Sequence, residues 1–157
     1  MLIRKVRKSE LNKVIEMKIK LYQHSRNLEN KDIDRKEIPR IIKAVRASYS
    51  SFKNRIFVCE IDQKIIGFIS ISVNFYRFGF KIKFIGSIGD FFIYEKYRGR
   101  GIGSKLKKIA FRWFKKWNCS SVSLKVHPKN ISTQMIYENW GFIRGNLEMV
   151  KRLSKYL

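Results

Sequence analysis

The chain has 157 residues, of which 45% are hydrophobic and 14% aromatic, and its formal net charge is +23. This composition suits the core of one domain and excludes a disordered chain, while no apolar run approaches the roughly 20 residues of a membrane span. The charge comes from 35 Lys and Arg against 12 Asp and Glu. It favours nucleic acid, an acidic protein surface or a polyphosphate ligand as partner, although a solvated lysine-rich surface explains it equally well.

The chain contains two cysteines, Cys59 and Cys119, with neither CxxC nor Cys/His spacing. This pattern predicts reduced, packed thiols and gives no support to a metal site, because zinc needs four ligands at characteristic spacings. The N-terminal segment is charged but lacks the apolar stretch of a secretory signal. We therefore expect a cytoplasmic protein without a bound metal.

The first fifty residues predict a strand followed by two helices. Residues 2–6 are a short apolar strand candidate, and Ser9 is expected to cap a helix whose apolar residues recur at helical spacing. Residues 27–36 are polar and charge-dense, which predicts a surface connection. In the second helix Pro39 suits the first turn, and apolar residues recur at helical spacing from residue 38 to 45.

The middle of the chain predicts three antiparallel strands. Two β-rich runs, 56–61 and 65–73, are separated by the turn-like Asp62-Gln63-Lys64, and a third run covers 81–93. The connection before the third run contains the aromatic sequence NFYRFGF. Its alternating rings predict either packing at a core edge or contact with a substrate or subunit.

The last third of the chain predicts a parallel βαβ unit. A helix of about four turns follows Gly103, with apolar residues on one face and lysines on the other. Residues 121–126 predict a strand parallel to 81–93, since such crossovers are right-handed. A helix over 130–139, ended by Gly141, and a last strand over 147–153 complete a single α/β domain that spans residues 1–157.

Residues 97–105, YRGRGIGSK, predict a phosphate-binding turn between a strand and a helix. Gly99, Gly101 and Gly103 lack Cβ atoms, so the backbone can fold closely around an anion at the positive end of the helix dipole. The spacing GxGxG matches neither GxxxxGK[ST] nor GxGxxG, which argues against a Walker A loop and a dinucleotide fingerprint. The ligand is therefore expected to carry a phosphate or pyrophosphate.

Arg98, Gly101 and Gly103 form the pattern RxxGxG. Further along the chain, Asn130 is followed seven residues later by Tyr137, the first residue of the sequence YENWGF. In these motifs the chain resembles the GNAT family of acyltransferases, over residues 55–145 well and over the helical start loosely. The resemblance implies a GNAT fold, a mixed sheet of six to seven strands flanked by about four helices. The sheet would be splayed at a cleft for acetyl-CoA.

The resemblance also implies how acetyl-CoA binds. The strand before the glycine turn would pair with the pantetheine arm, one of its N–H groups would polarise the thioester carbonyl, and the pyrophosphate would lie on the amides of the turn. The expected cofactor-binding residues are Phe91, Phe92, Ile93, Arg98, Gly99, Arg100, Gly101, Ile102, Gly103, Ser104, Asn130 and Tyr137.

Helical spacing predicts two faces for residues 130–139. Residues seven apart lie two turns apart on one face, so Asn130, Thr133 and Tyr137 are expected to face one direction. The opposite, core-facing side is expected to carry the apolar residues Ile131, Met135, Ile136 and Trp140.

Tyr137 is the candidate general acid for a departing thiolate, and Asp90, an unusual carboxylate in an apolar run, is the candidate base. Asp90 in an edge ion pair with a lysine is the structural alternative. Glu60 is a weaker candidate base, and His127 a weaker candidate proton relay. Many protein acetyltransferases of the family carry a Glu five residues before the Asn, where this chain has Lys125, so the base is not identified.

The function implied is that of an acetyl-CoA-dependent N-acetyltransferase that transfers the acetyl group directly to a primary amine. The net charge repels a free polycation, which favours a protein lysine or N-terminus on an acidic or nucleic-acid-associated partner. The alternatives are an acetyltransferase of a small-molecule amine and a nucleic-acid-associated binding module. Under each of these functions the protein is expected to be a monomer or homodimer. The module would use the basic residues Arg26, Arg35, Lys36, Arg40, Lys43 and Arg46.

Overall fold

The computed structural model describes residues 1–78 and 81–145. In this part of the chain five strands form one open sheet in the order β1-β2-β3-β4-β5. The strands are β1 (Leu2–Lys5), β2 (Asn54–Ile61), β3 (Lys64–Phe78), β4 (Lys81–Ile93) and β5 (Cys119–Leu124). The first four pair antiparallel and β5 runs parallel to β4, which confirms the predicted α/β class and the parallel pair.

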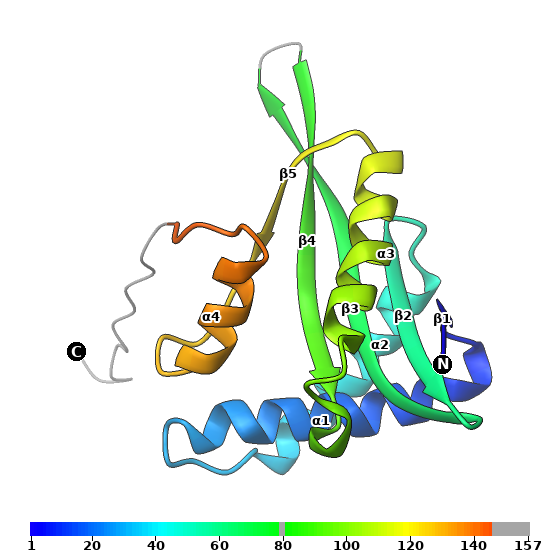
Figure 1. The fold of residues 1–157 in the computed structure, drawn as a ribbon, viewed down its shortest axis with the longest axis vertical. Helices are drawn as coiled ribbons and strands as arrows, with labels where there is room; N and C mark the ends of the chain where they lie inside the picture. Colours follow the sequence, from blue (N-terminus) through cyan, green and yellow to red (C-terminus); the bar gives the residue numbers. More distant parts are fainter. Residues whose placement is uncertain (79–80, 146–157) are drawn as a thin grey trace.

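The α-helices of the described residues cover both faces of this sheet. They are α1 (Leu11–Asn27), α2 (Ile38–Ser50), α3 (Ile102–Lys116) and α4 (Ile131–Asn139). Helices α1 and α2 pack on one face and α3 on the other, while α4 lies beside β5 (Figure 1). None of these helices is long and apolar enough to cross a membrane.

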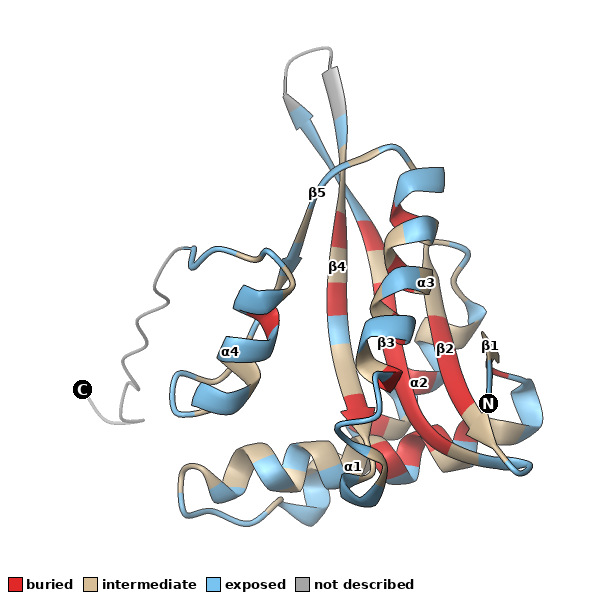
Figure 2. Cartoon of the chain, viewed as in Figure 1, coloured by how far each residue is buried: buried red, intermediate tan, exposed pale blue. Residues whose placement is uncertain are grey.

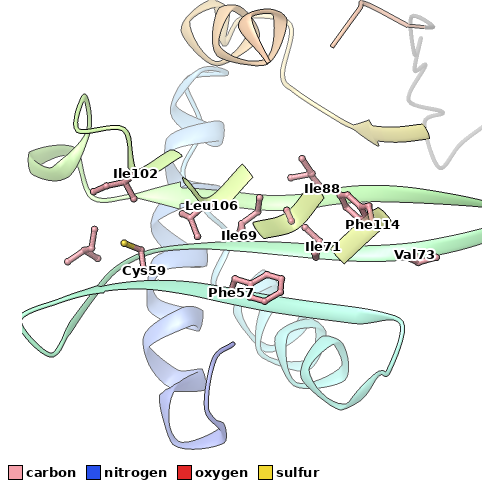
Figure 3. Packing of buried hydrophobic residues seen from close by; sticks show 11 residues of the cluster. Phe57, Cys59, Ile69, Ile71, Val73, Ile88, Ile102, Leu106 and Phe114 are labelled. Atoms are coloured by element: carbon pink, nitrogen blue, oxygen red, sulfur yellow. The ribbon is translucent and has the colours of Figure 1, made fainter. Parts of the chain in front are cut away.

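Two hydrophobic cores, one on each side of the sheet, follow from the two-residue period of the strands. Phe57 of β2 and Ile71 of β3 pack toward α3, where Leu106 and Phe114 are buried (Figure 3). On the other face Phe68 belongs to the core formed with α1 and α2. Because β2 and β3 are covered on both sides, their buried residues form nearly continuous runs (Figure 2).

The β2–β3 hairpin and the two cysteines agree with the sequence predictions. Asp62 and Gln63 have φ values of 47° and 60°, the left-handed conformation that a type I′ hairpin turn requires at both central positions. Cys59 and Cys119 are free thiols. Burial raises the pKa of the Cys59 thiol, so this residue is an unreactive part of the core.

The start of α1 differs from the prediction. Ser9 does not cap α1, because a 3₁₀ turn at Lys8–Glu10 precedes the helix. The carboxylate of Glu10 instead accepts the backbone N–H of Arg7 (2.8 Å) and pairs with the Arg4 guanidinium (2.7 Å). Pro39 lies in the first turn of α2, as predicted.

The described sheet has five strands, fewer than the expected six to seven. The strand predicted over residues 147–153 lies outside the described residues. The other predicted strands and the four predicted helices are all found, with β3 extending to Phe78, five residues beyond the predicted end.

Candidate functional site

Strands β4 and β5 separate part-way along their length. Their parallel pairing extends from Phe84 with Cys119 to Ile88 with Leu124, and residues 89–93 of β4 continue without pairing to β5. A cleft of about 750 Å³ opens where the two strands diverge. It is lined by the C-terminal half of α1, the end of β4, the glycine turn, the residues after β5, and α4.

A β-bulge at the start of the unpaired segment directs Asp90. The β3–β4 register shifts beside Ser70, so that Gly89 and Asp90 together lie opposite this one residue. The Ser70 hydroxyl accepts the Asp90 N–H (2.8 Å) and donates to Asp90 Oδ2 (3.0 Å). The bulge therefore holds the carboxylate at the wall of the cleft, where Asp90 is one of the lining residues.

The end of β4 presents backbone groups to the cleft. Tyr94 donates its N–H to a β3 carbonyl (3.0 Å), and the alternation of an antiparallel ladder then directs the backbone of Phe92 toward β3 and that of Phe91 and Ile93 away from it. Arg98 Nε donates to the Ile93 carbonyl (3.0 Å). Phe91 therefore offers its N–H to the open side, whereas the predicted backbone contact from Phe92 does not fit this register.

The glycine turn leaves the first amides of α3 available. Gly99 and Gly101 have φ values of 73° and 71°, which L side chains rarely adopt, and Gly101 begins α3 without a side-chain cap. The N–H groups of residues 102–104 have no intrahelical acceptor, because the first intrahelical hydrogen bond is donated by the Lys105 N–H to the Gly101 carbonyl (3.2 Å). At Gly103 a Cβ atom would lie 3.2 Å from the Phe91 ring. The local geometry thus has the features expected of an anion site at a helix N-terminus.

Of the two arginines of the turn, one lines the cleft. Arg98 belongs to the lining, together with the buried Ile102 and the exposed Ser104. Arg100 does not, and its guanidinium lies 5.7 Å from the centroid of the Tyr97 ring. The predicted contact of Arg100 with the cofactor is therefore not supported by its position.

Helix α4 forms the opposite wall, and Asn130, Thr133 and Tyr137 all line the cleft, as helical spacing predicted, but the predicted apolar side is wrong. Tyr137 is 9% exposed, whereas Ile131, Met135 and Ile136, which were expected to face the core, are between 44% and 58% exposed. The Tyr137 ring packs against Trp140, with centroids 5.5 Å apart. The apolar period of this short helix therefore does not mark its inner side.

Asn130 lies at the start of α4 and lines the cleft. Its Oδ1 accepts the backbone N–H of Thr133 (3.2 Å), which is the usual contact of an N-cap. Asn130 thus positions the first turn of α4.

Burial raises the pKa of Tyr137 to about 12, and the negative charge of Asp90 adds to the shift. Because the charge of Asp90 affects the pKa of Tyr137, the two side chains interact electrostatically, and both line the cleft. Below pH 10 the Tyr137 hydroxyl therefore remains protonated and can donate a proton.

Lys18 of α1 contacts the candidate base Asp90, a pairing partner that the sequence did not identify. Its Nζ lies 2.9 Å from Asp90 Oδ2, and the two side chains are only 12% and 13% exposed. A signal was present, because Lys18 follows Val14 by four residues and precedes Tyr22 by four, on the apolar side of the predicted helix. An ion pair with a lysine was the alternative to a catalytic role that the sequence left open for Asp90.

The two weaker catalytic candidates lie in different places. His127 lines the cleft; its Nδ1 accepts the Lys129 N–H (3.2 Å), so a neutral ring donates from Nε2 to Glu29 (3.2 Å). Glu60 pairs with Arg4 where β2 meets β1 and is not part of the cleft lining. His127 therefore stays a candidate, and the position of Glu60 argues against a role as base.

The wall contributed by α1 could not be foreseen, because no local motif marks it. Its lining residues are Leu21, Tyr22, His24 and Ser25. The remaining lining residues outside the predicted set include Lys125, Thr133 and Trp140.

Comparisons with known proteins agree with this geometry. The profile of the acetyltransferase (GNAT) family matches residues 19–142. An uncharacterized N-acetyltransferase of Methanocaldococcus jannaschii is 32% identical over 102 residues, which cover 62% of this chain and 45% of that protein. N-alpha-acetyltransferase 30 of Saccharomyces cerevisiae is 32% identical over 75 residues, 48% of this chain and 40% of the yeast protein. The chain thus spans about half the length, or less, of these curated relatives.

Solved structures show the same fold at low sequence identity. A tetramutant of the BH1408 protein from Bacillus halodurans has a TM-score of 0.84 at 18% identity, covering 98% of this chain and all of that one. The aminoglycoside N-acetyltransferase AAC(6')-Iy in complex with CoA has a TM-score of 0.74 at 18% identity, with coverages of 98% and 99%. With the family profile matching most of its length, the chain belongs to the acetyltransferase (GNAT) family.

Proposed function

We propose that the chain is an acetyl-CoA-dependent N-acetyltransferase that transfers the acetyl group directly to a primary amine. The observation that carries the proposal is the splayed cleft between β4 and β5. Its lining combines the outward-facing end of β4, the uncapped amides of α3 and the hydroxyl-bearing side chain of the largely buried Tyr137. Membership of the GNAT family supports the same reaction class.

The lining residues fit acetyl-CoA. The amides of residues 102–104, at the positive end of the α3 dipole, suit the pyrophosphate, and Arg98 adds a positive charge beside them. The backbone groups of Phe91 and Ile93 that point away from β3 suit the amides of the pantetheine arm. Acetyl-CoA would supply an activated acetyl thioester.

The chain's own groups then divide the chemistry. The Phe91 N–H stabilises the negative charge that develops on the thioester oxygen as the amine nitrogen bonds to the carbonyl carbon and the carbon–sulfur bond breaks. Tyr137 donates its proton to the departing thiolate, and Asp90 accepts the proton released by the amine. The latter proton returns to Tyr137 through water, so both groups end as they began. Lys18 and Ser70 bind Oδ2, which leaves Oδ1 of Asp90 for the amine.

We propose a protein lysine or N-terminus as the acceptor, on an acidic or nucleic-acid-associated partner in the cytoplasm. A net charge of +23 repels a free polycation over about a Debye length, roughly 10 Å. The negative charge of Asp90, which would attract a small amine, is already balanced by Lys18. Relatives named N-alpha-acetyltransferase 30 support a protein N-terminus. A small-molecule amine is the alternative and belongs in the same activity screen.

Calorimetric titration with acetyl-CoA tests the proposal. We expect Gly101→Asp to abolish measurable binding, because the new carboxylate lies at the anion site and the residue has a φ of 71°. Gly145→Asp is the matched control, since Gly145 is exposed, has no positive φ and has no other atom within 4 Å of the position that a Cβ would occupy. Equal affinities of the Gly101→Asp protein and the wild type for acetyl-CoA would contradict the proposed cofactor site.

A further inference from the structure

Exposed aromatic rings and cations meet where α3 ends, on the face of the sheet that α3 covers. Phe52 and Phe75 are 66% and 54% exposed. Lys53 Nζ lies 4.2 Å from the centroid of Phe75 and 5.6 Å from that of Phe52. The Phe52 ring lies 6.1 Å from that of Trp117, the residue after α3. These four residues are called the aromatic platform below.

Helix α3 carries cations without any acidic residue to balance them. Its six basic residues are Lys105, Lys107, Lys108, Arg112, Lys115 and Lys116. All except Lys107 are exposed, and none of the six forms an ion pair with a described residue. The five exposed residues are called the cationic stripe.

Most of the stripe does not stabilise the helix that carries it. Lys108 and Arg112, and Arg112 and Lys116, are like charges four residues apart, a spacing that is destabilising on a helix. Lys105 lies in the first turn, at the positive end of the helix dipole, which is also unfavourable. Lys115 and Lys116, in the last turn, do suit the negative end of the dipole. Helix stability therefore gives no reason for Lys105, Lys108 and Arg112, whereas a polyanionic ligand does.

The stripe and the platform are continuous along the molecule. Lys116, the last residue of α3, directly precedes Trp117 of the platform, and from Lys105 to Lys116 the helix rises about 16 Å. Rows of cations beside exposed aromatic rings are the features that bind the phosphates and stack the bases of single strands. We propose that this surface binds single-stranded nucleic acid, with phosphates along the stripe and bases on Phe52 and Phe75.

Other occupants fit less well. A symmetric second copy would set the stripe of one chain against the stripe of the other, and the like charges would repel. An acidic protein would satisfy the stripe but has no need of two exposed rings held beside Lys53. The sequence-based candidates for nucleic acid were Arg26, Arg35, Lys36, Arg40, Lys43 and Arg46. The last three lie on α2, which packs on the opposite face of the sheet, and Arg26 of α1 is paired with Glu37.

Fluorescence anisotropy with a labelled 20-nucleotide oligo(U) RNA tests the proposal. Five neutralised phosphates predict a slope of log K against log salt of about −3.5, a roughly hundredfold loss of affinity between 50 and 200 mM salt. In the Arg112→Glu/Lys116→Glu protein we expect a slope shallower by about 1.4. In the Phe52→Ala/Phe75→Ala protein we expect the slope to persist and the affinity to fall about tenfold or more.

The matched control is Lys43→Glu/Arg46→Glu, the same change of charge on exposed residues of α2. The proposal would be overturned if the affinity for oligo(U) fell equally in the α2 and α3 variants, or if it were unchanged in the Phe52→Ala/Phe75→Ala protein. Tighter binding of a 20-base-pair duplex or of oligo(Glu) than of oligo(U) would also overturn it. Melting temperature and acetyl-CoA affinity, measured on every variant, should match the wild type. A failure of nucleic-acid binding is thereby distinguished from a failure of the proposed enzyme.

Discussion

Replacement of Tyr137 by Phe tests the proposed general acid most sharply. The substitution removes one oxygen from a ring that is 9% exposed and packs against Trp140. Loss of a positioned general acid typically costs 10²- to 10⁴-fold in rate. We expect kcat to fall about a hundredfold or more while calorimetry gives the wild-type affinity for acetyl-CoA, because the cofactor amides are untouched.

The same substitution predicts a change in stability at high pH. The pKa of Tyr137 rises from an ordinary value of 10.0 to about 12 in the folded chain, so this contribution to stability is complete below pH 10 and is lost between pH 10 and 12. Two units correspond to about 2.7 kcal/mol, and about half of that, roughly 1.4 kcal/mol, is lost at pH 11.

Urea unfolding of both proteins at pH 8 and pH 11, followed by circular dichroism, isolates this contribution. All other titrating groups are common to the two proteins, so the wild type should lose about 1.4 kcal/mol more than the Tyr137→Phe protein. An equal loss in both would refute the raised pKa of Tyr137. A wild-type kcat in the variant would remove Tyr137 from the mechanism.

Two further substitutions test the supporting structure. Lys18→Met leaves the carboxylate of Asp90 without its ion pair, at a site that is only 13% exposed. We therefore expect the free energy of unfolding to fall by about 2 kcal/mol in urea titrations. We also expect kcat to fall. Lys20→Met, at a 54% exposed position of the same helix, should cost under about 1 kcal/mol, and equal losses would contradict the role of the pair. Gly86→Ala should destabilise by about 1–3 kcal/mol in the same assay, because its Cβ would lie 2.5 Å from the Phe114 ring; a neutral effect would show that α3 is not packed against β4 as described.

The parts of the site that the sequence could predict are those set by local chemistry. Gly99 and Gly101 stand where the backbone needs a positive φ, and the glycine turn begins a helix, so the anion site follows from a few adjacent residues. The face of Tyr137 follows from helical spacing. Phe91 is available because residues 89–93 of β4 continue without pairing to β5, a splay that was expected only from the resemblance to the GNAT family.

The parts that could not be predicted depend on contacts between distant segments. Lys18 reaches Asp90 across 72 residues of sequence, and only the packing of α1 under the β4 bulge brings them together. Helix α4 buries little, so its apolar residues do not identify its inner face, and Ile136 is 44% exposed. Arg100 follows Arg98 by two residues, but the turn between them directs only Arg98 to the cleft.

The central claim is direct transfer of an acetyl group to an amine within the β4–β5 cleft. The most direct test is mass spectrometry after incubation with carbon-13-labelled acetyl-CoA, a panel of peptides with free N-termini or lysines, and a panel of small amines. The account predicts one labelled acetyl group on an amine nitrogen of a peptide, at a rate that Tyr137→Phe reduces about a hundredfold or more. Label that enters no amine while acetyl-CoA binds, or that accumulates on the protein as an acetylated intermediate, would contradict it.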